Sequence, residues 1–527
     1  MNILIADDIS EIGLAKLQAL PGADVRIRTG LSEAQLISEV ADVEAILVRS
    51  ATRITAPVLE AAKQLKVVGR AGVGVDNIDI PAATKHGVIV INAPDGNTIS
   101  AAEHTFAMLM SAARLIPSAH GKLHEGKWDR KSFVGVELRG KTLSVLGMGR
   151  IGTEVAKRAL AFEMTVVGYD PFLTDERAKE LGITRATLED AIAAGDFITV
   201  HTPLTKETRH MINKEAFLRM KDGVRVINCA RGGIIDEEAL VEALRSGKVA
   251  GAALDVFEKE PLAADHPLLS MQNVVVTPHL GASTIEAQVN VAIDVAEEVS
   301  KVLLGKSFRN AVNLPAMSSE QREYLEPYLQ LGEKLGLFAA QWLAGDMSDI
   351  EISYGGNLAH SDVSFITRTV LKGLLGYQYG DEVNYVNAPL LADQGGISVR
   401  ELKDPRSKVF TNLVVLSIKS GQETHRVAGT LYNGFGVRIV EVDGFAVDAS
   451  PEGKVLLLRH TDKPGIIGQI GTMLGDAEVN IATMQVGRKE TGGEAIMFLG
   501  VDKLVPDEVV AKIEKIADIH QVRSIEL

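Results

Sequence analysis

In the first hundred residues, short and mainly apolar runs alternate with longer stretches in which apolar and polar residues mix. Short, mainly apolar runs are typical of strands that are buried on both faces of a parallel sheet. Polar stretches of helical length separate these runs, which is the order of a βαβ unit. The pattern therefore predicts a flavodoxin-like α/β unit with strands at residues 2–6, 45–48, 67–70 and 88–92.

A second α/β unit follows an apolar helix that we expect over residues 101–116. Glu103, His104 and Arg114 interrupt this helix, so it is too polar and too short to span a bilayer, and we expect it to lie buried between domains or in a dimer. The helical stretch 283–304 has no strand of a new sheet after it, which predicts that it returns to the first unit. Strands of the second unit are expected at residues 141–146, 165–169, 197–200, 224–228, 251–254 and 274–276.

The remainder of the chain switches pattern twice. A linker is expected at 311–316, a helix from 319, and strands from about residue 350. After the turn sequence DASPEG at 448–453, the last unit has the order β-α-β-β-α-β, which is the ferredoxin-like pattern. The expected fold is α/β, with two Rossmann or flavodoxin-like domains with parallel sheets, then an intervening α+β domain and a ferredoxin-like domain. The expected domain boundaries are 1–98 with 283–315, 99–282, 318–452 and 454–527.

Three glycines lie between the first strand and the first helix of the second unit. Gly147, Gly149 and Gly152 have the G-x-G-x-x-G spacing. The first glycine permits a tight turn, the second leaves room for a pyrophosphate, and the third lets the helix pack closely on the strand. The spacing alone is a weak signal, but a strand precedes it and a helix follows it, so the context favours dinucleotide binding.

The next strand ends in Asp170, where a carboxylate can accept hydrogen bonds from the ribose hydroxyls of NAD. The same carboxylate would repel the 2′-phosphate of NADP, and Pro171 and Phe172 supply no cation to offset that repulsion. Taken alone, Asp170 could equally be a turn residue before a proline. Together with the glycines, it predicts NAD as the cofactor.

Composition excludes several other classes of protein. The formal net charge of −14 disfavours a nucleic-acid partner. The start of the chain lacks a secretory signal, and we expect no membrane partner. Cys229 is the only cysteine, which rules out an intramolecular disulfide and a cysteine-rich metal site, and it suits the cytoplasm. We expect no resident metal.

Three polar residues follow strands of the second unit and are candidates for chemistry on a hydroxy acid: Arg231, Glu260 and His279. Ligands of open α/β sheets bind beyond the carboxyl ends of the strands, so these side chains should meet in one cleft. An imidazole can exchange a proton near neutral pH, a carboxylate can orient it, and a guanidinium can hold a substrate carboxylate. Each residue alone could be a turn or helix-end residue, and only the combination indicates catalysis.

The segments GMGRIG at 147–152, NCARGG at 228–233, ALDVFEKEP at 253–261 and TPHLGAST at 277–284 resemble the D-2-hydroxyacid dehydrogenase family. The resemblance covers residues 1–315. It implies that Arg231, Glu260 and His279 are catalytic. Cys229 has no adjacent base, so we expect no nucleophilic role for it, and the resemblance implies that it contacts the cofactor. The further cofactor contacts implied are Arg150, Ile151, Asp170, Thr202, Ala230, Asp255 and Gly281.

The sequence VGRAGVGVDNID at 68–79 and the two C-terminal units are similar to the long-form phosphoglycerate dehydrogenases within that family. This resemblance implies NAD-dependent oxidation of D-3-phosphoglycerate to 3-phosphohydroxypyruvate, the first step of serine biosynthesis. Val73 departs from relatives that carry threonine there. The substrate residues implied are Arg49, Arg70, Gly72 and Asn77, with Arg130 reaching in from a neighbouring subunit.

The last unit resembles an ACT regulatory domain through HTDKPG at 460–465 and VNI at 479–481. The resemblance implies serine as the effector, bound between paired ACT domains by His460, Asp462 and Asn480. Asp462 replaces the asparagine of some relatives. A domain used only for assembly is an equally open interpretation, and pairing predicts a homodimer or homotetramer.

Two other functions remain open at this point. One is reduction of glyoxylate, hydroxypyruvate or another 2-oxo acid by the same kind of site. The other is a non-catalytic, NAD-sensing interaction protein with this fold. The regulatory unit and the arginines near the cleft weaken the first, and the complete set of Arg231, Glu260 and His279 weakens the second.

Overall fold

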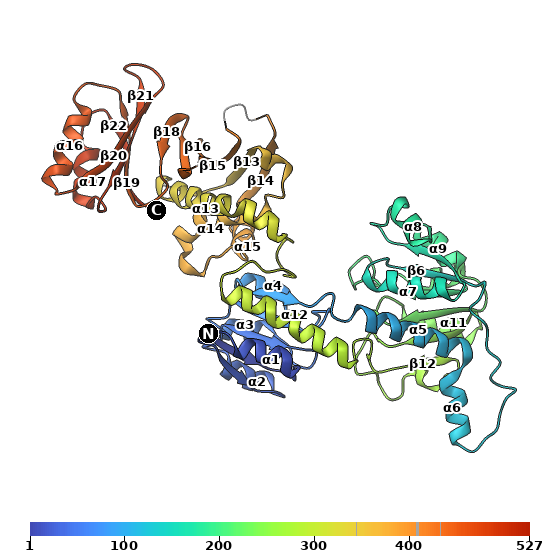
Figure 1. Ribbon diagram of the computed structural model, residues 1–527. Helices are drawn as coiled ribbons and strands as arrows, with labels where there is room; N and C mark the ends of the chain where they lie inside the picture. The colour runs from blue at the N-terminus through green and yellow to red at the C-terminus, as the bar shows by residue number, and fades with distance from the viewer. Residues whose placement is uncertain (344, 407–409, 433) are drawn as a thin grey trace.

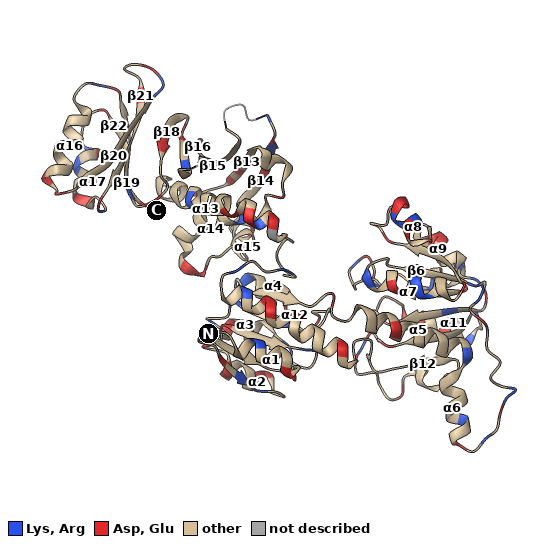
Figure 2. Ribbon diagram, in the orientation of Figure 1, with Lys and Arg blue, Asp and Glu red and all other residues tan. Residues whose placement is uncertain are grey.

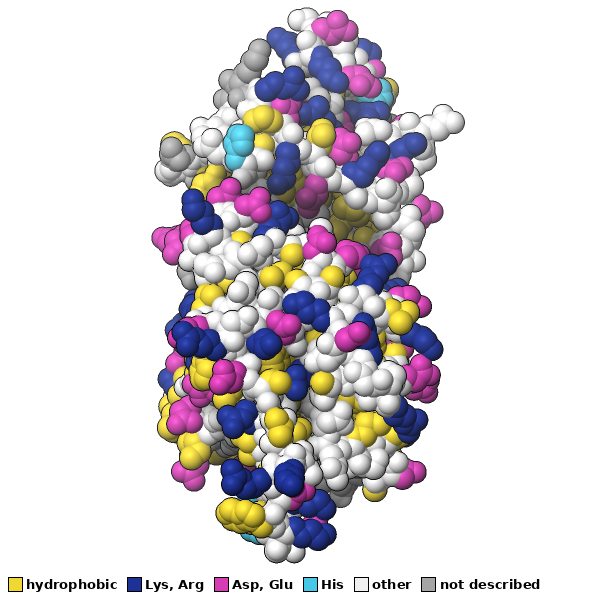
Figure 3. Space-filling view, turned by 90° about the vertical axis from the view of Figure 1, so that its right-hand side faces the viewer, with side chains coloured by type: hydrophobic (Ala, Val, Ile, Leu, Met, Phe, Trp, Pro, Cys, Tyr) yellow, Lys and Arg dark blue, Asp and Glu magenta, His cyan; other side chains and the backbone are white. Residues whose placement is uncertain are grey.

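The computed structural model describes residues 1–343, 345–406, 410–432 and 434–527. In these ranges, four β-sheets follow one another along the chain. The N-terminal unit lies between the dinucleotide unit on one side and the two C-terminal units on the other (Figure 1). Acidic and basic residues are distributed over all four units (Figure 2), and a space-filling view shows both signs of charge interspersed over one face (Figure 3). In the described ranges, no helix has the length and apolarity needed to cross a membrane.

The first sheet is parallel throughout, with strand order β2-β1-β3-β4-β5, which is the flavodoxin-like order. Its strands are β1 (Asn2–Ile5), β2 (Asp24–Ile27), β3 (Ala45–Val48), β4 (Val67–Arg70) and β5 (Ile89–Asn92). Four helices connect them: α1 (Glu11–Gln18), α2 (Glu33–Glu39), α3 (Ala56–Ala61) and α4 (Ile80–Lys85). The sequence pattern missed β2, an edge strand in which no residue is buried.

Helix α12 (Ile285–Leu303) packs on this first sheet although it comes almost 200 residues later in the chain. Two glycines permit the close approach. A Cβ atom at Gly13 of α1 would lie 2.7 Å from the Ala292 carbonyl oxygen, and one at Gly69 of β4 would lie 2.7 Å from Val299 Cγ2. The chain therefore returns to the first unit after it has formed the dinucleotide unit, and α12 completes the helical cover of the first sheet. The domain boundaries given above stay a prediction.

The second sheet is also parallel, with order β12-β11-β10-β9-β6-β7-β8. This is the doubly wound Rossmann order, and its direction reverses between β6 and β9. The strands are β6 (Thr142–Leu146), β7 (Thr165–Tyr169), β8 (Thr184–Arg185), β9 (Phe197–Val200), β10 (Val224–Asn228), β11 (Val249–Leu254) and β12 (Val274–Val276). The sequence pattern missed only the two-residue strand β8.

The helices of the second unit are α5 (Thr98–Arg114), α6 (Ile116–His124), α7 (Arg150–Ala161), α8 (Asp175–Leu181), α9 (Leu188–Ala194), α10 (Lys214–Arg219), α11 (Glu237–Arg245) and the 3-10 helix η1 (Pro267–Ser270). Leu115 separates α5 from α6 because its φ of 55° is left-handed. The apolar helix predicted over 101–116 therefore begins three residues earlier and ends two residues earlier than expected. Helix α5 buries its apolar face against α7 and the strands β10 and β11.

The third sheet is mixed, with order β14-β13-β15-β16-β17-β18 and one parallel pair, β13 with β14. Its strands are β13 (Asp349–Gly356), β14 (Ser398–Asp404), β15 (Asn412–Ser420), β16 (Glu423–Tyr432), β17 (Gly436–Val442) and β18 (Phe445–Ala449). Its helices are α13 (Ser319–Trp342), η2 (Asn357–His360), α14 (Ser364–Tyr379), η3 (Gly380–Glu382) and α15 (Ala388–Gln394).

The fourth sheet is antiparallel, with order β20-β21-β19-β22, as the ferredoxin-like pattern predicts. It comprises β19 (Lys454–Thr461), β20 (Ile481–Arg488), β21 (Glu494–Val501) and β22 (Ile519–Glu526), with helices α16 (Ile466–Asp476) and α17 (Asp507–Glu514). One hydrophobic cluster runs from the third unit into the fourth, where Phe338 stacks on Phe498 at 6.2 Å. The two C-terminal units therefore share a core, and the expected fold class is confirmed.

The expected linker at 311–316 is fixed to the first sheet. Ala311 forms an antiparallel bridge with Ile91, and the Asn313 side chain donates to the Val88 carbonyl oxygen at 2.9 Å and accepts from the Val90 N–H at 3.0 Å. These contacts lie more than 200 residues apart in the chain, so the local sequence gives no sign of them.

Candidate active site

A cleft of about 1240 Å³ lies between the first two sheets, at the carboxyl ends of their strands. Most residues predicted to bind or react line it. Gly147, Gly152, Asp170 and Asp255 lie outside its lining, as do Asn77 and Arg130. The predicted residues that line the cleft are Arg49, Arg70, Gly72, Gly149, Arg150, Ile151, Thr202, Cys229, Ala230, Arg231, Glu260, His279 and Gly281.

His279 and Glu260 form a pair at the mouth of the cleft. His279 Nδ1 lies 2.9 Å from Glu260 Oε2, and the Phe257 N–H donates to Glu260 Oε1 at 3.1 Å. Burial opposes ionisation of Glu260, but the hydrogen bonds from His279 and Phe257 outweigh it and hold the pKa of Glu260 below its usual value. Because an ionised carboxylate only accepts hydrogen bonds, Nδ1 carries a proton, so the neutral form of the ring has its lone pair on Nε2. This is the arrangement of a general base with an orienting acid.

Arg231 connects the two units across the cleft. Its Nε donates to Asp76 Oδ2 at 3.1 Å, and its Nη1 donates to the Ala230 carbonyl oxygen at 2.7 Å. A Cβ atom at Gly74 would lie only 1.9 Å from Nη2, so the guanidinium rests directly on the loop after β4. Asn228 fixes the base of this turn, because its side chain donates to the Arg231 carbonyl oxygen at 2.8 Å.

Arg70 supplies a second cation inside the cleft. Burial, together with the nearby positive charge of Arg231, lowers the pKa of Arg70 to about 10. Its Nε is buried and has no hydrogen-bond partner in the part of the chain that the structure describes. Gly72 lies directly beside it, since a Cβ there would be 2.0 Å from Arg70 Nη1. A buried cation with an unused donor suits an anionic ligand.

Arg49 and Asn77 have different positions. Arg49 lines the cleft directly after β3, and its backbone N–H donates to Asp7 Oδ2 at 2.6 Å. The Asn77 side chain donates to the Arg49 carbonyl oxygen at 2.8 Å and to the Thr52 carbonyl oxygen at 2.6 Å. Asn77 thus holds the backbone that carries Arg49 and lies behind the cleft surface, and its predicted contact with substrate stays a prediction.

The glycine-rich turn fits the pyrophosphate of a dinucleotide. Gly147 has a φ of 100°, and a Cβ there would lie 2.6 Å from the His201 carbonyl oxygen. A Cβ at Gly152 would lie 2.0 Å from the Gly147 carbonyl oxygen, whereas a Cβ at Gly149 would meet no atom within 4 Å. Gly149 therefore faces open space at the start of α7, where no side chain caps the helix N–H groups. These groups can hold a phosphate.

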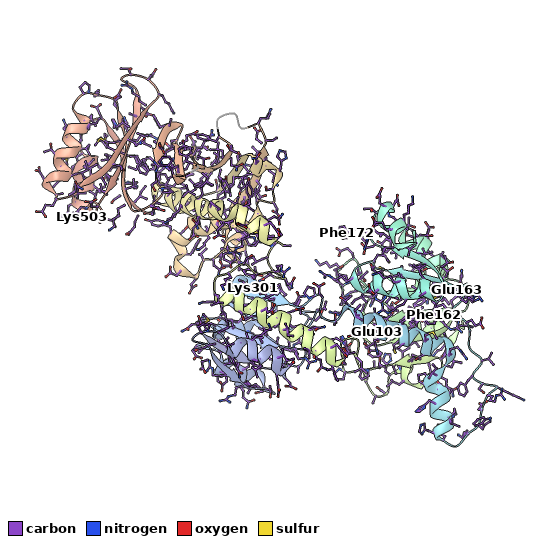
Figure 4. All side chains as sticks on the ribbon, viewed as in Figure 1. Glu103, Phe162, Glu163, Phe172, Lys301 and Lys503 are labelled. Atoms are coloured by element: carbon purple, nitrogen blue, oxygen red, sulfur yellow. The ribbon has the colours of Figure 1, made fainter. Side chains whose placement is uncertain are left out.

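Asp170 supports the same turn from the end of β7. Its Oδ2 accepts from the Met148 N–H at 2.9 Å, and its Oδ1 accepts from the Phe172 N–H at 2.8 Å. Phe172 itself is 91% exposed and projects from this unit (Figure 4). The carboxylate is thus placed beside the glycines, as NAD binding requires. Its contact with a ribose stays a prediction.

Cys229 lines the cleft but is unsuited to nucleophilic chemistry. Burial raises the pKa of the Cys229 thiol, and the negative charge of Asp255 raises it further. A raised thiol pKa leaves little thiolate near neutral pH.

We expect Cys229 to react with iodoacetamide at pH 8 at least about ten times more slowly in the native protein than in urea, because thiolate is the reactive form. Mass spectrometry of the single cysteine measures both rates on one site. Equal rates in the two states would contradict this account of the thiol.

The predicted effector residues do not meet within one chain. His460 is 2% exposed and pairs in register with Ala495, at the end of the sheet where β19 stops. Asn480 lies at the opposite end, where its side chain donates to Asp502 Oδ2 at 2.8 Å. Asp462 accepts from Arg488 Nη1 at 2.9 Å. A ligand that contacted His460, Asp462 and Asn480 together would need a second chain.

Arg130 lies in an exposed segment after α6 and does not line the cleft of its own chain. Its expected role in a neighbouring subunit stays a prediction.

Two residues near the site were not predicted from the sequence to belong to it. Asp76 pairs with Arg231, and His104 lies 3.2 Å from Asp255. The sequence did single out His104 as one of three charged or titratable residues in a mainly apolar helix, but it gave no sign of a contact with Asp255.

Three family models match the chain. Residues 106–281 match D-isomer specific 2-hydroxyacid dehydrogenase, NAD binding domain. Residues 324–443 match D-3-phosphoglycerate dehydrogenase intervening domain, and residues 454–518 match ACT domain.

Among solved structures, the chain is 36% identical to the TT0316 protein of Thermus thermophilus, with a TM-score of 0.55, over 59% of this chain and 100% of that one. It is 30% identical to D-lactate dehydrogenase of Aquifex aeolicus, solved with NAD and lactic acid, with a TM-score of 0.52, over 58% of this chain and 96% of that one.

Full-length relatives agree with the family models. The chain is 48% identical to D-3-phosphoglycerate dehydrogenase of Bacillus subtilis (strain 168) over 526 residues, which cover 100% of this chain and 99% of that one. It is 46% identical to the protein of the same name from Archaeoglobus fulgidus over 529 aligned residues, which cover 100% of each chain. With its cleft, its NAD-binding unit and its two C-terminal units, the chain belongs to the D-3-phosphoglycerate dehydrogenase family.

Proposed function

We propose that the protein oxidises D-3-phosphoglycerate to 3-phosphohydroxypyruvate with NAD, which is the first step of serine biosynthesis. The observation that supports this most is the convergence of Arg49, Arg70 and Arg231 with the His279–Glu260 pair in one cleft. A phosphate carries a charge of about −1.5 to −2 at neutral pH, and a carboxylate adds one more. A site for a substrate with these two anionic groups therefore needs several cations, and these three arginines supply them.

Each polar residue of the cleft has its own role in the proposed reaction. Arg231 binds the substrate carboxylate and draws electron density from the neighbouring C2 oxygen. Arg49 and Arg70 bind the phosphate. His279 Nε2 removes the proton of the C2 hydroxyl, and Glu260 stabilises the imidazolium that results. Bound NAD supplies the acceptor for the hydride that leaves C2.

The test is the initial rate of NADH formation with D-3-phosphoglycerate, compared with unphosphorylated D-glycerate at the same concentration. We expect turnover selective for the phosphorylated acid, because only that substrate uses Arg49 and Arg70. Equal turnover of both acids, or faster reduction of glyoxylate or hydroxypyruvate, would assign the protein to another D-2-hydroxyacid dehydrogenase. No turnover of any of these would favour a non-catalytic role.

Asp170 should set the preference for NAD over NADP. We expect Asp170→Ala to lower kcat/KM for NAD about tenfold and to raise relative use of NADP, because the change removes the ribose acceptor and the repulsion of a 2′-phosphate. Steady-state kinetics with both cofactors measures the ratio. Asp175→Ala, an exposed acid on the same unit, is the matched control. An unchanged NAD to NADP ratio would contradict this role for Asp170.

The ACT domain supports a small-molecule effector, and we propose serine, bound between two copies of the chain. The separation of His460 from Asn480 within one sheet supports a site that needs two chains. Adding serine to the NADH assay tests the effector, and light scattering tests for a dimer or tetramer. A dimer whose turnover ignores serine would make the domain an assembly module. We further propose a cytoplasmic location, which suits a chain with one unpaired cysteine.

A further inference from the structure

A buried carboxylate lies directly behind His279. Asp255 follows β11, and its side chain is fully buried. Oδ1 accepts from the Thr277 hydroxyl at 2.6 Å and from the Leu280 N–H at 2.7 Å, and Oδ2 accepts from the Gly281 N–H at 2.8 Å. A buried charge is stable only when donors surround it closely, so each of these donors matters.

His104 reaches the same carboxylate from helix α5. Its Nε2 lies 3.2 Å from Asp255 Oδ1 and 3.3 Å from Thr277 Oγ1. Thr277 has only one hydroxyl proton and gives it to Asp255, so both oxygen atoms can accept from His104. Nε2 therefore carries a proton, and His104 is a donor to the carboxylate. Burial opposes ionisation of Asp255, but the hydrogen bonds from His104 and Thr277 outweigh it and keep the pKa of Asp255 below its usual value.

Asp255 in turn determines the backbone around His279. The His279 N–H donates to the Asp255 carbonyl oxygen at 2.8 Å, and the N–H groups of the next two residues donate to its carboxylate. His279 has a φ of 57°, which is left-handed. A residue other than glycine adopts this conformation only at a cost in free energy, so the contacts with Asp255 must hold it there.

We propose that His104 is a positioning residue of the dehydrogenase reaction, which holds Asp255 so that the turn carrying His279 keeps its left-handed geometry. The proposal rests on the proposed function of the cleft. His104 does not touch the substrate region itself, because it does not line the cleft. Its effect passes through one carboxylate to the base that removes the proton.

The expected effect is on turnover and not on binding. A displacement of about 1 Å at a catalytic group can cost about a hundredfold in rate. Arg49, Arg70 and Arg231, which bind the substrate, are held by contacts that do not involve His104. A defect in the turn at His279 should therefore lower kcat and leave KM for the acid nearly unchanged.

The experiment compares His104→Phe, which keeps a flat ring without a donor, with His104→Gln, which keeps a donor near the position of Nε2. We expect His104→Phe to lower kcat about ten- to a hundredfold, with KM for phosphoglycerate and the Kd of NADH within about twofold of wild type. His104→Gln should recover most of the lost rate. His360→Phe, the same change at an exposed histidine of the third unit, is the matched control.

A second readout does not depend on turnover. In the full-length protein, the NMR resonances of the His279 imidazole, identified by their loss in His279→Asn, should move in His104→Phe and return toward wild type in His104→Gln. If His104→Phe does not fold, His104→Asn replaces it, since its amide is too short to reach Asp255. Wild-type kcat with unmoved resonances, or no recovery in His104→Gln, would overturn the proposal.

The two readouts separate failure of the inference from failure of the proposed function. If the wild-type protein does not oxidise phosphoglycerate, the function is wrong, and the NMR comparison still decides whether His104 holds the turn. If the wild type is active and His104→Phe matches it in rate and resonances, only the inference is wrong.

Discussion

His279→Ala should lower kcat for phosphoglycerate oxidation by about 10²- to 10⁴-fold, because the change removes the group that we propose accepts the hydroxyl proton. The Kd of NADH should stay within about twofold of wild type, since the His279 side chain is 48% exposed and its removal disturbs little of the fold. Stopped-flow or steady-state kinetics measures the rate, and NADH fluorescence measures binding. A kcat within tenfold of wild type would remove His279 from the role of base.

The chain provides a close control for this prediction. His210 is also left-handed, with a φ of 51°, and its Nε2 lies 3.1 Å from Glu258 Oε1. It belongs to the same unit but does not line the cleft. His210→Ala removes the same side chain from the same backbone conformation beside the same kind of partner. Turnover of this variant should match wild type. A loss of turnover that occurs only in His279→Ala would then come from removal of the base and not from a change in the backbone.

Arg231→Ala should lower kcat/KM for phosphoglycerate by about 10²- to 10³-fold. Truncating one partner of a charge-assisted, desolvated contact costs about 2 to 5 kcal/mol, and each 1.4 kcal/mol is a factor of ten. The variant should still bind NADH, because the glycine-rich turn and Asp170 lie elsewhere in the cleft region. Steady-state kinetics with the substrate varied measures the loss.

Arg231→Lys separates charge from geometry. Lysine keeps the positive charge but cannot offer two parallel N–H donors to a carboxylate. We expect this variant to recover less than half of the lost free energy. Arg245→Ala, which removes an exposed arginine from the last turn of α11, is the control for the loss of a surface charge. Full recovery by lysine would mean that Arg231 acts only through its charge.

The sequence predicted most of the strands because a buried strand consists of a short run of mainly apolar residues, which can be recognised locally. Strand β3 is apolar on both faces, and that pattern is visible in its four residues. Strand β2 lies at an edge with one half-exposed polar face, so its composition resembles that of a loop. Likewise, the break after α5 depends on one residue, Leu115, whose left-handed φ has no marker such as glycine.

The candidate residues at strand ends could be predicted for a similar reason. In a parallel sheet the carboxyl ends of all strands meet at one edge, so Arg231 and His279 had to be near each other once their strands were assigned. The sequence did not predict which of these residues face the cleft. Asp255 is at such an end and is fully buried, and the Asn77 side chain donates to the backbone of Arg49 and does not line the cleft.

By itself, the sequence determined the order of the four units, the glycine-rich turn, and the set of groups that can carry the chemistry. These depend on local spacing and on residue type, which the chain shows directly. Only the tertiary structure decided that His104 stands behind His279, that Asp76 meets Arg231 across two sheets, and that His460 and Asn480 lie at opposite ends of one sheet. Such contacts join residues far apart in the chain. Their distances depend on how helices and sheets pack, and a local sequence pattern does not determine that packing.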